Sequence, residues 1–111
     1  MPATKIAGAV TLICTPPEGY FTVLKRIVVS ATTGGVVTVY DTSVAIDATL
    51  DAGEAMFLFN LPATTTYDIP NINITTRGSG TSGKIYIDVA SDATAVGVVY
   101  YDHVGFGVTP A

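Results

Sequence analysis

Charge is scarce in this chain of 111 residues. Charged residues make up 13% of the sequence, about half of the ~25% that is usual for soluble domains. The length suits one domain with a core of its own. With so little charge to cover it, much of the surface must be apolar or neutral. We therefore expect the protein to oligomerise or to dock onto a larger body, the alternative being a plain Thr/Ser-rich surface.

Basic residues are too few and too scattered to form a nucleic-acid-binding face. There are five of them, and the formal net charge is −4. Only Lys25 and Arg26 are adjacent, and on a strand their side chains would point to opposite faces. Because a phosphate-binding face needs clustered Lys and Arg, we expect no nucleic-acid partner.

Cysteine and histidine each occur once, as Cys14 and His103. A single cysteine excludes an intrachain disulfide and a disulfide-stapled module. One Cys and one His are also too few for a zinc site. We interpret Cys14 as a small buried hydrophobe. The alternative is a nucleophile, for which His103 is the only histidine available as a base.

Long hydrophobic runs are missing as well. The stretch "KIAGAVTLIC" is much shorter than the ~20 apolar residues of a membrane-spanning helix. One lysine precedes the apolar residues and no small-x-small cleavage pattern follows, so the stretch does not match a signal peptide. We expect it to form a strand, with no membrane partner and with synthesis in the cytoplasm.

In place of charged residues, the sequence is rich in residues that are typical of β-strands. Val, Ile and Thr dominate, and their branched side chains suit a pleated surface. Eleven glycines and six prolines divide the apolar runs. This pattern predicts about eight short strands with turns between them. The expected segments are Thr4–Cys14, Tyr20–Ala31, Val36–Asp41, Val44–Ile46, Glu54–Asn60, Tyr67–Ile69, Ile72–Thr76, Lys84–Val89 and Ala95–Tyr101.

These segments predict one all-β domain over residues 1–111, an antiparallel β-sandwich of jelly-roll type. An immunoglobulin-like sandwich is the alternative, although the sequence has no tryptophan for its core. Residues 1–5 and 103–111 could be extended arms. The Gly/Ser-rich stretch "RGSGTSG" at Arg77–Gly83 predicts an open, mobile hairpin loop.

Alternation within two segments predicts which side chains face the core. In Tyr20–Ala31 one face should carry Phe21, Val23, Ile27 and Val29, with Lys25 interrupting it. In Lys84–Val89 the inward residues should be Ile85, Ile87 and Val89, with Tyr86 and Asp88 outward.

Two strands end on a Tyr-Asp pair: "GGVVTVYDTS" at Tyr40-Asp41 and "GVVYYDHVGFG" at Tyr101-Asp102. Together with His103 the two aspartates could form an acid/base site, provided that their strands end at the same edge. Aspartate before Thr-Ser or before a Gly-rich stretch is also what turns use, because the carboxylate accepts hydrogen bonds from nearby backbone N–H groups. We favour turns and predict no catalytic residue.

No pattern for a cofactor or a metal ion is present. The acidic stretch "DATLDAGE" at Asp47–Glu54 lacks the alternate carboxylates of a calcium loop. "GSGTSGK" at Gly78–Lys84 has the glycine and lysine spacing of a phosphate loop, but Ile85 replaces the hydroxyl residue that would hold Mg²⁺. We expect neither metal nor cofactor.

Several strand and turn motifs follow one another along the chain in an order that resembles that of a known protein family. "RIVVSATTGGVVTVYDTS", an acidic turn, "FLFNLPATTTYDIPNINITTRGSGTSGKIYIDV" and a closing Tyr-rich strand resemble the capsid decoration (staple or cement) proteins of epsilon-fifteen-type short-tailed phages. The resemblance covers about Lys25 to Tyr101. It implies a non-enzymatic jelly-roll protein of the virion that binds the major capsid protein on the outer surface of the shell. It also implies a homodimer across local twofold axes of the shell. Many copies, each with modest contacts, would then hold the shell together against internal DNA pressure.

Contacts with the shell are expected from the chain ends and from exposed aromatic residues. Interfaces favour apolar anchors such as those of "PPEGYF" and of the C-terminal segment; the alternative for Tyr20 and Phe106 is that they cap the core. The candidate interface residues are Pro16, Pro17, Tyr20, Phe21, Tyr100, Tyr101, His103 and Phe106.

A carbohydrate-binding or host-adhesion module is the rival class. Sugar-binding sandwiches place exposed aromatic rings beside Asp and Asn, and Tyr40-Asp41 and Tyr101-Asp102 fit that description. Against it stand the missing tryptophan and the missing calcium loop.

Overall fold

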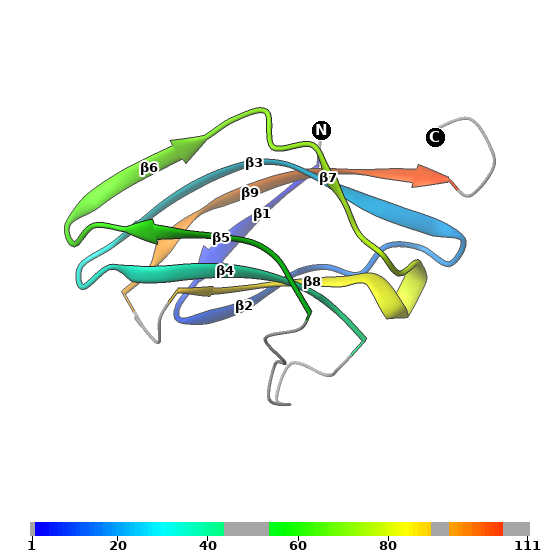
Figure 1. The fold of residues 1–111 in the computed structure, drawn as a ribbon, viewed down its shortest axis with the longest axis horizontal. Coiled ribbons are helices and arrows are strands. Elements are labelled where there is room, and N and C mark those ends of the chain that lie inside the picture. Colours follow the sequence, from blue (N-terminus) through cyan, green and yellow to red (C-terminus); the bar gives the residue numbers. More distant parts are fainter. Residues whose placement is uncertain (1, 44–53, 90–93, 106–111) are drawn as a thin grey trace.

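A computed structural model describes residues 2–43, 54–89 and 94–105 (Figure 1). In these ranges the chain forms nine strands and one short 3-10 turn. They are β1 (Ala3–Ala7), β2 (Val10–Cys14), β3 (Tyr20–Ala31), β4 (Gly35–Thr42), β5 (Ala55–Leu61), β6 (Thr65–Ile69), β7 (Ile74–Thr75), η2 (Gly80–Gly83), β8 (Lys84–Val89) and β9 (Val96–Gly105). The expected strand Val44–Ile46 lies outside the described residues.

The strands form two antiparallel sheets packed face to face (Figure 1). One sheet has the order β1-β9-β3-β6, and β7 pairs with the first part of β3. The other has the order β2-β8-β4-β5. The predicted all-β sandwich is confirmed. The jelly-roll arrangement stays a prediction at this point.

The predicted strand Thr4–Cys14 is two strands in different sheets. β1 pairs with β9 in one sheet, while β2 pairs with β8 in the other. Gly8 separates them at a φ of +88°, a conformation that glycine adopts without steric cost. Apolar residues on both sides of Gly8 hide this break in the sequence. Residues 3–5 are therefore hydrogen-bonded in a sheet and do not form the predicted arm.

The second predicted arm also begins inside a strand. β9 continues to Gly105, and His103 pairs with Thr22 of β3. Residues 106–111 lie outside the described part of the chain, so the prediction for that portion concerns residues the structure does not describe.

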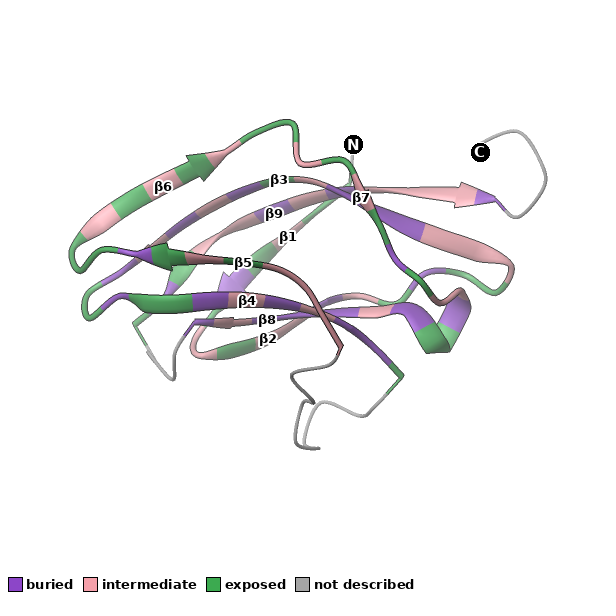
Figure 2. Cartoon of the chain, viewed as in Figure 1, coloured by how far each residue is buried: buried purple, intermediate pink, exposed green. Residues whose placement is uncertain are grey.

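The core lies between the two sheets, as the buried segments in Figure 2 show. In β8 the predicted inward residues Ile85, Ile87 and Val89 are fully buried. Tyr86 is also buried, although alternation places it on the opposite face of β8. Its strand is interior, and the register sets Leu12 of β2 and Tyr40 of β4 on either side of it. The expected exposure of Tyr86 was therefore wrong.

A β-bulge in β3 changes the predicted faces. The register of β3 against β9 shifts between Leu24 and Arg26, so that Lys25 is an extra residue. A bulge of this kind interrupts the alternation of the strand. The core-facing residues are thus Leu24 before the bulge and Ile27 and Val29 after it. Val23 lies on the other face from Ile27, which corrects the prediction that the two share one.

Residues 77–83 connect the two sheets. β7 belongs to one sheet and β8 to the other, so the predicted hairpin loop is wrong. The connection contains η2, in which Gly80 and Gly83 are buried. It packs against β3 and β4 and closes one end of the sandwich.

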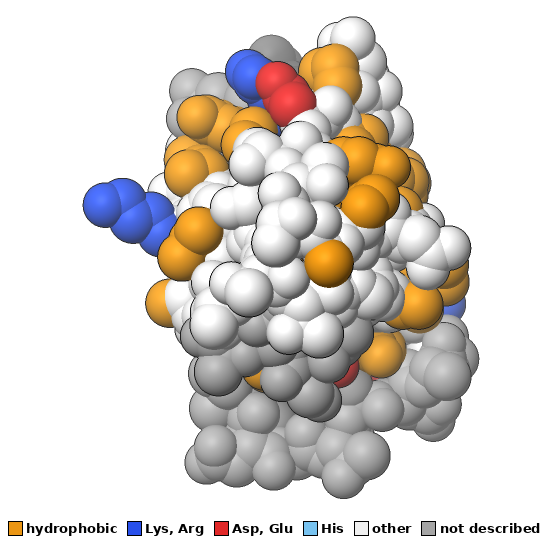
Figure 3. Space-filling view, turned by 90° about the vertical axis from the view of Figure 1, so that its left-hand side faces the viewer, with side chains coloured by type: hydrophobic (Ala, Val, Ile, Leu, Met, Phe, Trp, Pro, Cys, Tyr) orange, Lys and Arg blue, Asp and Glu red, His pale blue; other side chains and the backbone are white. Residues whose placement is uncertain are grey.

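At the opposite end of the molecule, the described part of the surface shows mainly hydrophobic side chains and uncharged groups (Figure 3). Charged groups on that face are few, as the composition predicts. Among the described residues, no helix is both long enough and apolar enough to span a bilayer.

Candidate functional site: a hollow over β3 and β9

Both Tyr-Asp pairs lie within strands, Tyr40-Asp41 in β4 of one sheet and Tyr101-Asp102 in β9 of the other. Their aspartates nevertheless have different surroundings. Asp41 of β4 is buried, and its Oδ2 accepts hydrogen bonds from the backbone N–H of Arg77 and from Nε of Arg77 at 3.4 Å. Asp102 of β9 lies on the outer face of the other sheet, where Val23 of β3 is its partner. Asp41 lies inside β4 and anchors a connection that is distant in the sequence, and Asp102 lies inside β9. The prediction that both aspartates lie in turns was therefore wrong, and the two carboxylates do not form a pair.

Cys14 and His103 meet through a threonine. The hydroxyl oxygen of Thr22 lies 3.6 Å from Sγ of Cys14 and 3.1 Å from Nδ1 of His103. Burial raises the pKa of the Cys14 thiol to about 11. Burial also lowers the pKa of His103, with the charge of Asp102 acting in the opposite direction. A reactive cysteine needs a lowered thiol pKa, so this geometry favours the interpretation of Cys14 as a packing residue.

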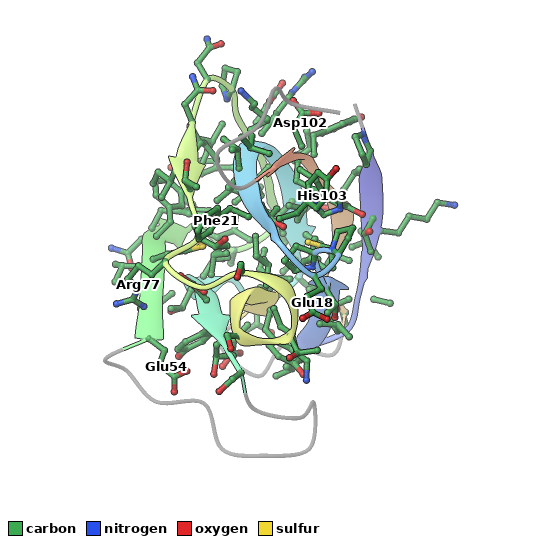
Figure 4. All side chains as sticks on the ribbon, turned by 90° about the vertical axis from the view of Figure 1, so that its right-hand side faces the viewer. Glu18, Phe21, Glu54, Arg77, Asp102 and His103 are labelled. Carbon is green, nitrogen blue, oxygen red and sulfur yellow. The ribbon has the colours of Figure 1, made fainter. Side chains whose placement is uncertain are left out.

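A hollow of about 780 Å³ lies beside this cluster, over the adjoining ends of β3 and β9. Figure 4 looks at this end of the molecule, with Asp102 and His103 on β9 and Arg77 on the opposite flank. Three of the predicted interface residues line the hollow, namely Pro17, Tyr20 and His103. The complete lining is Pro2, Pro17, Tyr20, Val23, Lys25, Asp102, His103 and Val104.

A second depression of about 530 Å³ continues the first, because both are lined by Lys25 and Asp102. Its lining adds the predicted interface residue Tyr100, together with Arg26, Pro70, Asn71 and Asn73. We call the two depressions together the β3/β9 hollow.

Asn71 and Asn73 shape one rim of the β3/β9 hollow. Both have positive φ, 60° and 56°, which asparagine tolerates better than most residues. Between them the N–H of Ile72 donates to the carbonyl oxygen of the bulge residue Lys25 at 3.0 Å. Nζ of Lys25 in turn donates to Oδ1 of Asn73 at 2.9 Å. The bulge therefore holds the segment between β6 and β7 along the edge of β3 with which both of these strands pair.

The cationic groups of the hollow are engaged within the chain. Arg26 donates to both carboxylate oxygens of Asp68, at 2.8 and 2.6 Å. These hydrogen bonds hold the pKa of Asp68 below its usual value and raise that of Arg26. The guanidinium also lies 5.6 Å from the ring centroid of Tyr100, within the range of a cation–π contact. The hollow thus offers Tyr and Pro surfaces beside cationic groups that already have partners.

The remaining predicted interface residues lie elsewhere. Tyr101 is buried in the core, and its hydroxyl lies 3.1 Å from that of Thr4. Alternation explains this, since Tyr100 and Tyr101 must face opposite sides of β9. Pro16 is buried and Phe21 is half-buried opposite Val104. Phe106 lies outside the described residues.

Sequence reasoning missed Lys25, Arg26, Asn71 and Asn73 as parts of the site. The proline and asparagines of "PNIN" mark a turn. Nothing local to that stretch shows that it folds back onto β3.

Comparison with known proteins found no matching family model, no similar curated protein and no similar solved structure. Over residues 2–43, 54–89 and 94–105, no three His, Cys, Asp or Glu side chains are grouped so that they could hold a metal ion.

Proposed function

We propose that this protein is a non-enzymatic decoration protein of a phage capsid. It binds the major capsid protein on the outer surface of the icosahedral shell and staples neighbouring subunits against internal DNA pressure. The observation that carries the proposal is the β3/β9 hollow, which gathers Pro17, Tyr20 and Tyr100 on one open face.

The chemistry of the hollow suits a protein partner. Tyrosine and arginine are enriched where interfaces bury surface, and Tyr loses little side-chain entropy on binding. Arg26 is held by Asp68 and by the ring of Tyr100, so its side chain is already ordered before binding. Ordering a flexible side chain on binding costs about 0.5–1.5 kcal/mol, and a residue that is ordered in advance avoids that cost.

The strand order supports the jelly-roll part of the proposal. β1 pairs with β9, β2 with β8, β3 with β6 and β4 with β5. The first strand thus pairs with the last and the pairing proceeds inward along the chain. A long antiparallel ribbon wound into two sheets has this order, and jelly-roll domains occur in viral capsids.

Modest contacts suffice for this function because a shell presents many identical sites. A dimeric decoration protein that engages two sites gains affinity through the high effective concentration of the second site. The low charge of the chain limits electrostatic repulsion between copies crowded on the lattice.

Sedimentation with capsids tests the proposal. Capsids of an epsilon-fifteen-type short-tailed phage, stripped of decoration protein, are incubated with the purified chain and pelleted. We expect saturable co-sedimentation, which Tyr20→Ser and Tyr100→Ser each weaken about 30-fold, the effect of losing an interface anchor of ~2 kcal/mol. Val36→Thr, at a position that is 46% exposed on the other sheet, is the matched control and should bind normally.

Carbohydrate binding is the second candidate. The observation in its favour is the ring of Tyr100 beside Asn71, Asn73 and Asp102 in one depression. Saturable binding on a glycan array, abolished by Tyr100→Ser and accompanied by no co-sedimentation with capsids, would replace the decoration proposal with this one.

A further inference from the structure

Two charged side chains of opposite sign lie where the two depressions of the β3/β9 hollow meet. Lys25 of β3 and Asp102 of β9 each line both depressions. The register sets Asp102 opposite Val23, two residues before Lys25. Both charged residues are half-buried. The hollow therefore has one ammonium and one carboxylate at its centre, each partly withdrawn from water.

Neither of these charges is neutralised within the described part of the chain. Arg26 is paired with Asp68, but Lys25 and Asp102 form no ion pair with any described residue. Nζ of Lys25 donates to Oδ1 of Asn73. Because an amide oxygen is uncharged, this hydrogen bond orders the ammonium and leaves its charge in place. A partner that closed the hollow without counter-charges would bury both groups unpaired, which is costly.

Apolar side chains lie on both sides of this pair of charges. Pro17 and Tyr20 line the first depression, and Pro70 and Tyr100 line the second. Each depression has the volume of a typical small-molecule site, ~300–1,000 Å³, and so has room for more than one side chain. A partner that fits this surface has apolar groups at both ends and, between them, two charges that complement those of the hollow.

We propose that a segment of the major capsid protein occupies the β3/β9 hollow and presents two side chains of opposite charge to it, a step that rests on the proposed function. A basic side chain of this segment pairs with the carboxylate of Asp102, and an acidic side chain pairs with the ammonium of Lys25. Apolar side chains on either side of them contact the tyrosine and proline surfaces.

Two charges of opposite sign give such a contact a direction. A capsid segment that enters the hollow in the reverse orientation sets like charges face to face, which disfavours binding. Tyrosine and proline surfaces alone would distinguish the two orientations less sharply. Lys25 and Asp102 thus select the orientation of the bound segment, while the aromatic anchors supply most of the affinity.

Co-sedimentation of charge variants with stripped capsids tests the inference. Asp102→Asn and Lys25→Gln should each weaken binding about 10-fold, because each leaves one charge of the capsid segment unpaired. The double variant should weaken binding about 100-fold, since each residue meets a partner of its own. Glu54→Gln and Lys84→Gln make the same charge changes at residues that do not line the hollow, and both should bind normally.

Two further measurements identify the effect as one of charge. Asp102→Glu keeps the carboxylate and should bind within about threefold of the wild type, whereas Asp102→Lys should bind about 100-fold more weakly. Raising the ionic strength from about 0.1 M to about 1 M shortens the screening length from ~10 to ~3 Å. Wild-type binding should therefore fall more steeply with salt than binding of the double variant.

Binding of the wild-type chain distinguishes a failure of this inference from a failure of the proposed function. A wild-type chain that does not pellet with capsids would overturn both. The inference alone fails if the wild type binds and either single neutral variant binds equally well, with a native circular dichroism spectrum. It also fails if the double variant binds no worse than the single ones, or if the salt dependences run parallel, because Lys25 and Asp102 would then meet no charge of the capsid.

Discussion

Thr22 connects β3 to β2, to β9 and to the residue that follows β7. Its side chain is fully buried in β3, and its hydroxyl contacts Cys14 of β2 and His103 of β9. Its N–H donates to Oγ1 of Thr76 at 3.0 Å, and its carbonyl oxygen accepts the N–H of Thr76 at 2.8 Å. A buried polar group must be satisfied in this way, because an unpaired one costs about 1–3 kcal/mol.

Asp41 should contribute far more to stability than Asp102. Asp41→Ala removes a buried acceptor of the Arg77 N–H, and we expect the free energy of unfolding to fall by about 2–3 kcal/mol. Asp102→Ala alters an open hollow and should change it by less than about 0.5 kcal/mol. Equilibrium denaturation of both variants provides the comparison. Equal losses would contradict the assigned difference between the two Tyr-Asp pairs.

Cys14 should make the protein less stable at high pH. The folded chain holds this pKa at about 11 against 9.0 for a free thiol. Below pH 9 both states keep the proton. As the pH rises from 9 toward 11 the unfolded chain loses the proton first, so the free energy of unfolding falls, by about 1–2 kcal/mol for this half-buried group.

The variant Cys14→Ala isolates this contribution from that of tyrosine and lysine, which also titrate at high pH. Denaturation at several pH values between 8 and 11 should show a steeper fall for the wild type than for the variant. Parallel curves would mean that burial does not perturb the thiol.

Among the elements, β3 has the greatest influence on the site. It pairs with β9 along most of its length and also with β6 and β7. Its bulge at Lys25 lets Leu24 and Ile27 both face the core. It also turns the Lys25 carbonyl toward Ile72 of the segment that forms the rim of the hollow. One extra residue thus serves both the packing of the core and the shape of the outer face.

Deleting Lys25 should be tolerated, because every other residue of β3 then keeps its present face. We expect a folded protein whose unfolding free energy is lower by about 1–2 kcal/mol, owing to the lost hydrogen bond to Ile72. Deleting Val28 should abolish folding, since it turns one half of the strand over. Proton NMR spectra of the two deletions distinguish these outcomes. Two equally unfolded proteins would show that the bulge is indispensable.

The sequence predicted the bounds of a strand well where Gly- or Pro-containing turns flank it on both sides. β3 has the predicted bounds, Tyr20–Ala31, because "PPEG" and "TTGG" stop the strand on both sides. The break at Gly8 escaped prediction because apolar residues continue across it. The aromatic part of the hollow was predictable from Tyr20 and Tyr100. Its polar rim was not, because the segment after β6 joins it through tertiary contacts with Lys25.

At the scale of the whole molecule, the sandwich keeps the β3/β9 hollow apart from the hydrophobic core. The β3/β9 hollow occupies the outer face of one sheet, while the core lies between the two sheets. A partner can therefore cover the hollow without displacing core side chains, as the proposed contact with the shell requires.

Cryo-electron microscopy of stripped capsids incubated with the purified chain is the most direct test of this account. It predicts density for the sandwich on the outer surface of the shell, with the β3/β9 hollow facing the major capsid protein. Bare capsids at saturating protein, or bound sandwiches with that hollow open to solvent, would contradict it.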